Sequence, residues 1–295
     1  MTTPDFWLIG APKCGSTSLY RWLSAHPDVF MCTPKEPNFF SQDIAVYHRA
    51  AHTWDEYLRL FDGASGFLAV GEASTSYSRS RVAVPAILER QPEARFVFCL
   101  RDPAEMIASV HGQMLRSGRE NVRDLREAFR LEPRRRLGES LPERTQDSRD
   151  YLYSDTCALG SQLSRLYENV DRSRVQLVFM EDLRVEPRKV WRELQEFIGI
   201  PDDGRSDFVP ENSRTIPRSV VAARGVRALQ RVKNRLIPRR SIGIGNIIRR
   251  ILERAPRTEE KGVSAELRTE LVSHFSGEVD KLEHLTGRDL TAWRK

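Results

Sequence analysis

The sequence predicts an α/β protein with a central parallel β-sheet flanked by helices. Short apolar runs typical of buried strands alternate along the chain with longer segments that have helical periodicity. This alternation favours a parallel sheet covered on both faces. With 295 residues and 40% hydrophobic side chains, the chain is long enough to bury a sizeable core. It contains no internal repeat or low-complexity tract, so we expect one domain over residues 1–295.

Each apolar run is short and ends at a glycine, a charged residue or a turn. The strands expected from these runs cover residues 6–9, 68–71, 95–100 and 175–179. Helix-capping residues and prolines then place the helices between and after them. The expected helices cover residues 16–26, 82–90, 103–115, 187–198, 219–254 and 264–285.

Residues 117–150 fit this alternation poorly. They carry many charges and little apolar periodicity beyond Leu125–Leu131. A mobile insertion over the functional edge of the sheet and a simple surface segment are both compatible with this pattern.

Charge is unevenly distributed along the chain. The net charge is +6, but residues 214–257 hold thirteen basic residues against one acid, Glu253, so this basic segment carries +12 and the rest −6. Such a segment favours an anionic ligand or partner, for example an anionic acceptor or carrier protein. A solvated basic face is the alternative, and we expect no nucleic-acid partner.

Hydropathy and cysteine usage indicate a cytoplasmic protein. No run approaches 18 consecutive apolar residues, and the first residues lack the charged flank and apolar stretch of a signal peptide. The four cysteines contain no CxxC pair, which favours reduced thiols over a disulfide framework or a zinc site.

The loop from Gly10 to Ser18, Gly-Ala-Pro-Lys-Cys-Gly-Ser-Thr-Ser, carries the strongest chemical signal. It lies between a predicted strand and a predicted helix, where backbone N–H groups and the helix dipole attract an anion. Gly15 allows close approach of the backbone, and Lys13 adds a positive charge. A Walker A loop would place lysine directly after the second glycine, at the position of Ser16. The loop is therefore P-loop-like without being a Walker A loop, and an ordinary tight turn is the alternative.

Three motifs in order resemble the PAPS-dependent sulfotransferases, in the branch of the heparan sulfate sulfotransferases and their bacterial relatives. They are Gly10–Leu19, His26-Pro-Asp-Val29 and Lys35-Glu-Pro-Asn-Phe-Phe40. The resemblance implies a central parallel sheet and a co-substrate, 3′-phosphoadenosine 5′-phosphosulfate (PAPS), bound without a metal. It assigns the 5′-phosphosulfate to the first loop, through Lys13, Cys14, Gly15, Ser16, Thr17 and Ser18.

A second set of residues follows the strand at 95–100. Arg101 stands at its carboxyl end, where ligands bind in open α/β sheets, and Ser109 lies on the next predicted helix. The resemblance assigns the 3′-phosphate of PAPS to this arginine and serine. A helix-capping ion pair between Arg101 and Asp102 is the alternative. The resemblance further implies a basic loop around the nucleotide, to which Lys261 and Gly262 fit, and it points weakly to Arg218.

Sulfuryl transfer needs a base for the acceptor proton and a cation for the leaving phosphate. Lys13 is the predicted cation, and Glu36, which matches the proposed base of the glycan-modifying branch, is the predicted base. His111 is the second candidate base, with a structural helix histidine as its alternative. The transferred group carries less charge than a phosphoryl group, so no Mg²⁺ is required.

One departure concerns the acceptor. Glycan-modifying relatives read Glu-Lys-Thr/Ser-Pro near the end of the second long strand, whereas this chain reads Glu72-Ala-Ser-Thr75 and lacks the lysine at Ala73. The missing lysine counts against a glycan acceptor. We expect the acceptor group to be a hydroxyl or amine, and a small molecule, a lipid and a glycan all stay open. A P-loop kinase or NTPase, and a catalytically idle protein that binds a nucleotide or another anion, are the other functions considered.

Overall fold

The computed structural model describes residues 2–143, 145–208, 215–217, 257–259 and 263–295. The chain divides into two compact units. The first unit comprises residues 1–107, 154–211 and 268–295, and the second comprises residues 108–153 and 212–267. The expectation of a single domain stays a prediction.

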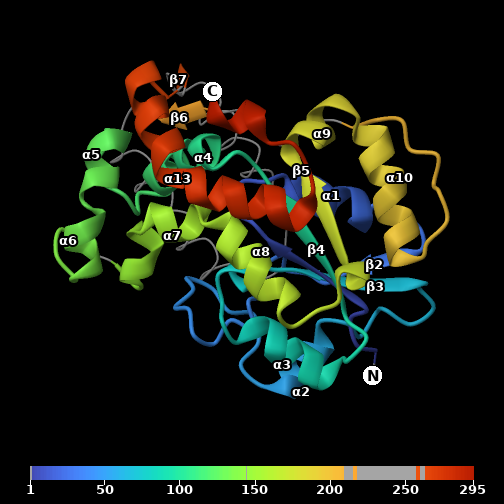
Figure 1. The fold of residues 1–295 in the computed structure, drawn as a ribbon. Helices are drawn as coiled ribbons and strands as arrows, with labels where there is room; N and C mark the ends of the chain where they lie inside the picture. Colours follow the sequence, from blue (N-terminus) through green and yellow to red (C-terminus); the bar gives the residue numbers. More distant parts are fainter. Residues whose placement is uncertain (1, 144, 209–214, 218–256, 260–262) are drawn as a thin grey trace. The chain divides into compact units, whose positions relative to one another are not determined.

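A five-stranded, fully parallel sheet forms the centre of the first unit (Figure 1). The strand order is β2-β3-β1-β4-β5, so β1 occupies the middle, with Phe6 opposite Gly71 on one side and Arg95 on the other. The strands are β1 (Phe6–Gly10), β2 (Val29–Met31), β3 (Ala69–Ala73), β4 (Arg95–Leu100) and β5 (Val175–Phe179). The predicted fold class is confirmed, and β2 is an additional strand that the sequence analysis did not predict.

Helices connect these strands, as the alternating pattern predicts. Within the first unit they are α1 (Ser16–Ser24), α2 (Trp54–Arg59), α3 (Ala83–Arg90), α8 (Leu159–Tyr167), α9 (Met180–Val185) and α10 (Pro187–Ile198). Short 3₁₀ helices are η1 (Thr75–Ser78), η3 (Arg172–Arg174) and η4 (Thr291–Arg294). Three helices run across the boundary of the units: α4 (Pro103–Arg116), α7 (Tyr153–Cys157) and α13 (Ala265–Thr286).

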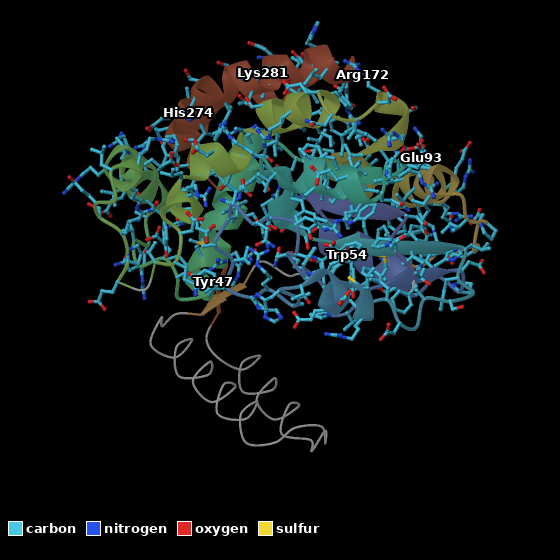
Figure 2. All side chains as sticks on the ribbon, turned by 90° about the horizontal axis from the view of Figure 1, so that it is seen from below. Tyr47, Trp54, Glu93, Arg172, His274 and Lys281 are labelled. Atoms are coloured by element: carbon cyan, nitrogen blue, oxygen red, sulfur yellow. The ribbon has the colours of Figure 1, made fainter. Side chains whose placement is uncertain are left out.

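The helices cover both faces of the sheet. Ile9 of β1 and Phe98 of β4 line one narrow cavity together with residues of α3 and α8. On the other face α1 and α10 meet through Trp22 and Trp191, whose rings contact edge to face at 6.1 Å (Figure 1). Arg172 donates a hydrogen bond of 2.9 Å to a carbonyl near the C-terminal end of α13 (Figure 2).

The second unit contains the segment that the sequence left unassigned. Residues 117–150 form α5 (Leu125–Arg130), α6 (Glu132–Arg136) and most of η2 (Ser148–Tyr151). Arg135 donates two hydrogen bonds, of 2.8 and 3.0 Å, to the Glu120 carboxylate, and neither side chain is exposed. This buried ion pair shows that the segment is not a simple surface, since a buried charge needs a partner. A short antiparallel pair, β6 (Thr215–Pro217) and β7 (Arg257–Glu259), also belongs to this unit.

Two further expectations concern the cysteines and membrane-spanning helices. The four cysteines are buried thiols that form no disulfide within the described chain. Among the described helices, none is long and apolar enough to cross a membrane. The helix expected over residues 219–254 lies outside the described residues.

A carboxyl group lies buried in the middle of the first unit. Glu72 of β3 is not exposed, and its Oε2 accepts hydrogen bonds from the hydroxyls of Tyr57 (2.8 Å) and Tyr77 (3.0 Å). Burial raises the pKa of Glu72 to about 7, although the two hydroxyls oppose that rise. Tyr77 in turn accepts a hydrogen bond from the Phe40 amide (3.2 Å), so the group supports the loop that follows β2.

We predict that Glu72 makes the stability of the protein fall as pH rises from about 4.5 to about 7. In this interval the unfolded chain has lost the Glu72 proton and the folded chain still holds it, so raising the pH favours unfolding. Urea denaturation across this pH range should show a decline of about 3 kcal/mol that Glu72→Gln removes. The exposed Glu186→Gln is the control. An equal decline in the wild type and in Glu72→Gln would contradict the prediction.

Candidate active site

The predicted site residues of the first unit gather at one edge of the sheet. Because all five strands are parallel, their carboxyl ends share this edge, and the loops after β1, β2, β3 and β4 begin there. These loops carry Lys13, Glu36, Thr75 and Arg101.

The loop after β1 is shaped for close approach of an anion. Gly15 caps α1 with a left-handed backbone, at a φ of 93°, and a Cβ built there would lie 2.7 Å from the side chain of Leu183. Only glycine fits this position without strain. The amides of Ser16 and Thr17, at the start of α1, precede the first intrahelical hydrogen bond and can bind an anion, whereas the Ser18 amide donates to the Gly15 carbonyl (3.0 Å).

Cys14 contributes to this loop through its backbone. Its thiol is fully buried, and burial raises the pKa of the thiol well above its usual value. The sulfur lies 3.8 Å from the Met106 sulfur and 3.4 Å from the Pro12 carbonyl oxygen. The side chain thus packs into the core and leaves only the backbone of Cys14 to take the binding role that the resemblance implies.

Arg101 holds the predicted anion-binding loop Gly10–Ser18, referred to below as the phosphate loop, against the end of β4. Its Nη1 donates to the Lys13 carbonyl (3.1 Å) and its Nη2 donates to Glu105 (2.9 Å). The residue is only 4% exposed, and its Nε has no hydrogen-bond partner among the described residues. A buried guanidinium with an unsatisfied N–H fits an incoming phosphate.

Asp102 is engaged elsewhere, so the alternative of an ion pair with Arg101 is wrong. The Asp102 carboxylate accepts a hydrogen bond from the Ala104 amide (2.9 Å) and pairs with Arg268 (2.6 Å). Ser109 is buried further along α4. Arg101 belongs to the first unit and Ser109 to the second, so their meeting on one phosphate stays a prediction.

Glu36 stands directly beside the end of β3. Its amide donates to the Ala73 carbonyl (2.8 Å), and its Oε1 accepts hydrogen bonds from Lys35 Nζ (2.8 Å) and Thr75 Oγ1 (3.2 Å). The Glu36 side chain is 38% exposed, so solvent and an acceptor can reach it. The rings of Phe39 and Phe40, which follow in the same loop, pack against Tyr57 and Trp54.

The Glu36 loop is held by residues that sequence reasoning missed. Arg49 donates hydrogen bonds to the carbonyls of Asn38, Phe39, Ser41 and Ile44. The Asn38 amide donates to Ser74 Oγ (3.0 Å), and Ser76 Oγ donates to Asn38 Oδ1 (2.7 Å). The only sequence signal was the polar run from Ser74 to Ser78, whose partners no spacing rule reveals.

His111 is placed as a structural histidine would be. It is 4% exposed, its Nε2 lies 2.9 Å from the Val122 carbonyl oxygen, and its ring meets Tyr153 edge to face at 5.8 Å. Burial lowers its pKa. These contacts within the second unit favour Glu36 as the base.

The other predicted site residues lie outside the described part of the chain. They are Arg218, Lys261, Gly262 and nearly all of the basic segment. Within the described residues, no group of three or more His, Cys, Asp or Glu side chains is arranged to hold a metal ion.

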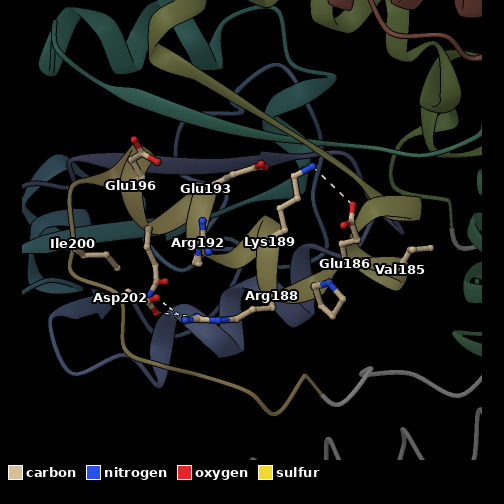
Figure 3. A pocket seen from close by; sticks show the side chains of 11 residues that line it. Val185, Glu186, Arg188, Lys189, Arg192, Glu193, Glu196, Ile200 and Asp202 are labelled. Carbon is tan, nitrogen blue, oxygen red and sulfur yellow. Dashed lines mark hydrogen bonds and ion pairs between the residues drawn. The ribbon is translucent and has the colours of Figure 1, made fainter.

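A groove of about 880 Å³ lies along α9 and α10, away from these residues in the sequence (Figure 3). Basic and acidic side chains both line it, and two ion pairs, Arg188–Asp202 and Lys189–Glu186, lie among them. None of the predicted site residues lines this groove.

Comparison with known proteins agrees with this geometry. The sulfotransferase domain family matches residues 3–216, which is most of the chain. A crystal structure of a sulfotransferase from Alicyclobacillus acidocaldarius is 26% identical and superimposes with a TM-score of 0.73, with complete coverage of both chains.

Curated relatives match over a shorter stretch. Carbohydrate sulfotransferase 15 of Mus musculus is 30% identical over 36% of this chain and 26% of its own length. The bifunctional heparan sulfate N-deacetylase/N-sulfotransferase 3 of Homo sapiens is 30% identical over 35% of this chain and 12% of its own length. The chain therefore spans about a quarter or less of these relatives. The family match favours sulfuryl transfer over a P-loop kinase or NTPase, and with the fold it shows that the chain belongs to the sulfotransferase family.

Proposed function

We propose that this protein transfers a sulfuryl group from PAPS to a hydroxyl or amine of a small-molecule, lipid or glycan acceptor. The observation that carries the proposal is the contact of Arg101 with Lys13 at the edge of the sheet where Glu36 also lies. It brings together an anion-binding loop, a permanently charged donor and a carboxylate base. The relatives named above are sulfotransferases, which supports the same chemistry.

The donor end of the site binds the two phosphate-bearing parts of PAPS. The amides of Gly15 to Thr17 and the Lys13 ammonium bind the 5′-phosphosulfate. Arg101 turns its unsatisfied Nε–H toward the 3′-phosphate, with Ser109 as a second donor. The nucleotide is a substrate here, and the role of Lys261, Gly262 and Arg218 around it belongs to the same proposal.

The transfer itself is an in-line displacement. The acceptor oxygen or nitrogen forms a bond to sulfur while its proton passes to the Glu36 carboxylate. The bond between sulfur and the bridging oxygen breaks, and its electron pair stays on the 5′-phosphate of the product, 3′-phosphoadenosine 5′-phosphate (PAP). Lys13 stabilises the charge that develops on this leaving phosphate.

The basic segment at residues 214–257 is proposed to dock an anionic acceptor or its carrier protein outside the donor pocket. The proposal rests on the charge of the segment alone. A cytoplasmic location is proposed on the sequence features given above.

Replacement of Arg101 tests the donor site. Arg101→Ala should weaken PAPS binding more than about tenfold, because a charge-assisted contact to phosphate contributes about 1.5–3 kcal/mol. Calorimetric titration of PAPS measures this. Arg95 lies at the opposite end of β4 and donates a hydrogen bond to the Phe197 carbonyl. Arg95→Ala is therefore the matched control and should leave the affinity unchanged. Unchanged affinity in Arg101→Ala would remove Arg101 from the site.

Replacement of Glu36 separates chemistry from binding. Glu36→Gln keeps the shape of the side chain but cannot accept the proton, so kcat should fall by about 10²-fold or more while PAPS affinity stays nearly unchanged. Transfer from ³⁵S-labelled PAPS to a panel of phenols, sugars and fatty alcohols provides the assay and identifies the acceptor class. The exposed Glu186→Gln is the control. A fully active Glu36→Gln enzyme would move the role to His111 or to unassisted attack.

A further inference from the structure

Lys35 forms an ion pair with the predicted base that the proposed mechanism does not use. Its Nζ lies 2.8 Å from Glu36 Oε1, and its side chain is only 19% exposed. Thr75 donates to the same oxygen (3.2 Å). Both donors therefore meet at Oε1, and among these described contacts Oε2 is the oxygen left to face an acceptor hydroxyl.

Lys35 precedes the residue that contacts Ala73, the position at which glycan-modifying relatives carry a lysine. The amide of Glu36 is hydrogen-bonded to the carbonyl of Ala73, so the backbone after β2 lies directly against the last residue of β3. Ala73 is fully buried and brings no charge to this edge. Lys35, one residue before the contact, supplies an ammonium group there.

The charge of Lys35 also acts on β4, next to the phosphate loop. Burial raises the pKa of the Cys99 thiol to about 12, and the positive charge of Lys35 lies close enough to oppose that rise. Cys99 belongs to β4, on the far side of β1 from β3, and its carbonyl accepts a hydrogen bond from the Ala11 amide at the start of the phosphate loop (2.9 Å). The charge of Lys35 therefore acts on β4, the strand that contacts the start of the phosphate loop, as well as on Glu36.

This environment differs from that of an ordinary surface ion pair. The Lys189–Glu186 pair of α10 has side chains 62% and 58% exposed and an N–O separation of 3.8 Å. Such pairs contribute little to stability. The partly buried Lys35 pair combines a short N–O contact of 2.8 Å with a third polar group, Thr75, so solvent screens its charges less than those of the surface pair.

We propose that Lys35 is a second catalytic cation of the sulfuryl-transfer centre. In the absence of substrates it neutralises Glu36. When PAPS and acceptor are bound, its ammonium contacts the sulfuryl oxygens and stabilises their charge during the displacement, and Glu36 becomes available for the acceptor proton. Lys35 stays protonated throughout, so bonds and protons balance as in the mechanism above. This inference rests on the proposed function.

The test compares PAP and PAPS with variants of Lys35. PAP lacks the sulfuryl group, so Lys35→Gln should bind PAP within about threefold of wild type, while kcat for transfer from PAPS falls about 10²-fold. The assay uses the best acceptor among 4-nitrophenol, N-acetylglucosamine and dodecanol. Lys189→Gln, which breaks the exposed pair, is the matched control and should keep kcat.

Two further variants separate charge from structure. Lys35→Arg keeps a cation and should retain kcat within about tenfold of wild type. The double variant Lys35→Gln/Ala73→Lys supplies an ammonium group from β3 in place of Lys35. Its kcat should be at least about tenfold higher than that of Lys35→Gln. Melting temperatures verify that each variant folds, and Lys35→Arg decides the matter if Ala73→Lys prevents folding.

The outcomes distinguish this inference from the proposed function. Loss of kcat in Lys35→Gln with rescue by Lys35→Arg supports a catalytic cation. Unchanged kcat in Lys35→Gln, or a loss that no cation rescues, overturns the inference and leaves the proposed function intact. A wild-type protein that neither binds PAP nor turns over PAPS overturns the proposed function and the role of Lys35 with it.

Discussion

The hydrogen bond from the Arg101 guanidinium to the Lys13 carbonyl joins the two loops on which the donor site depends. Its geometry follows from the parallel sheet, which places the ends of β1 and β4 side by side. Burying a guanidinium costs free energy unless its N–H groups find partners. Lys13 and Glu105 satisfy part of this requirement, while Nε is left without a partner in the described chain. The site is thus built around a buried positive charge that a phosphate would complete.

The acceptor side depends on a different constraint, the shape of the loop that carries Glu36. Glu36 and Asn38 both have left-handed backbones, with φ of 61° and 55°. Residues other than glycine adopt this conformation at a cost of about 1 kcal/mol or more each. Four carbonyl contacts from Arg49 and the hydroxyls of η1 hold the loop in this conformation. Beneath it, the buried Glu72 and its two tyrosines fix Tyr77, which receives the Phe40 amide. The loop that carries Glu36, the proposed base, is therefore anchored by buried hydrogen bonds.

Local sequence patterns predicted the elements that local physics determines. The strand at 95–100, the helix begun by Pro103 and the glycine loop before α1 all agree with the structure, because apolar runs, caps and glycines act over a few residues. β2 was missed because three residues are too short for a periodic signal. The sequence left residues 117–150 undecided because their buried centre is an ion pair, Glu120 with Arg135, which a hydropathy pattern counts as surface. Arg49 was not singled out because its acceptors are carbonyls of the preceding loop, which no side-chain pattern reveals. Lys35 was not singled out because its ion pair with the adjacent Glu36 depends on the conformation of that loop.

A crystal structure of the protein with PAP tests the central claim most directly. The account predicts the 5′-phosphate of PAP on the amides of Gly15 to Thr17 beside Lys13, and the 3′-phosphate within hydrogen-bond distance of Arg101. It also predicts that Lys35 and Glu36 lie next to the 5′-phosphate, where the sulfuryl group of PAPS would be. PAP bound elsewhere, with Arg101 still held only by Lys13 and Glu105, would contradict the account.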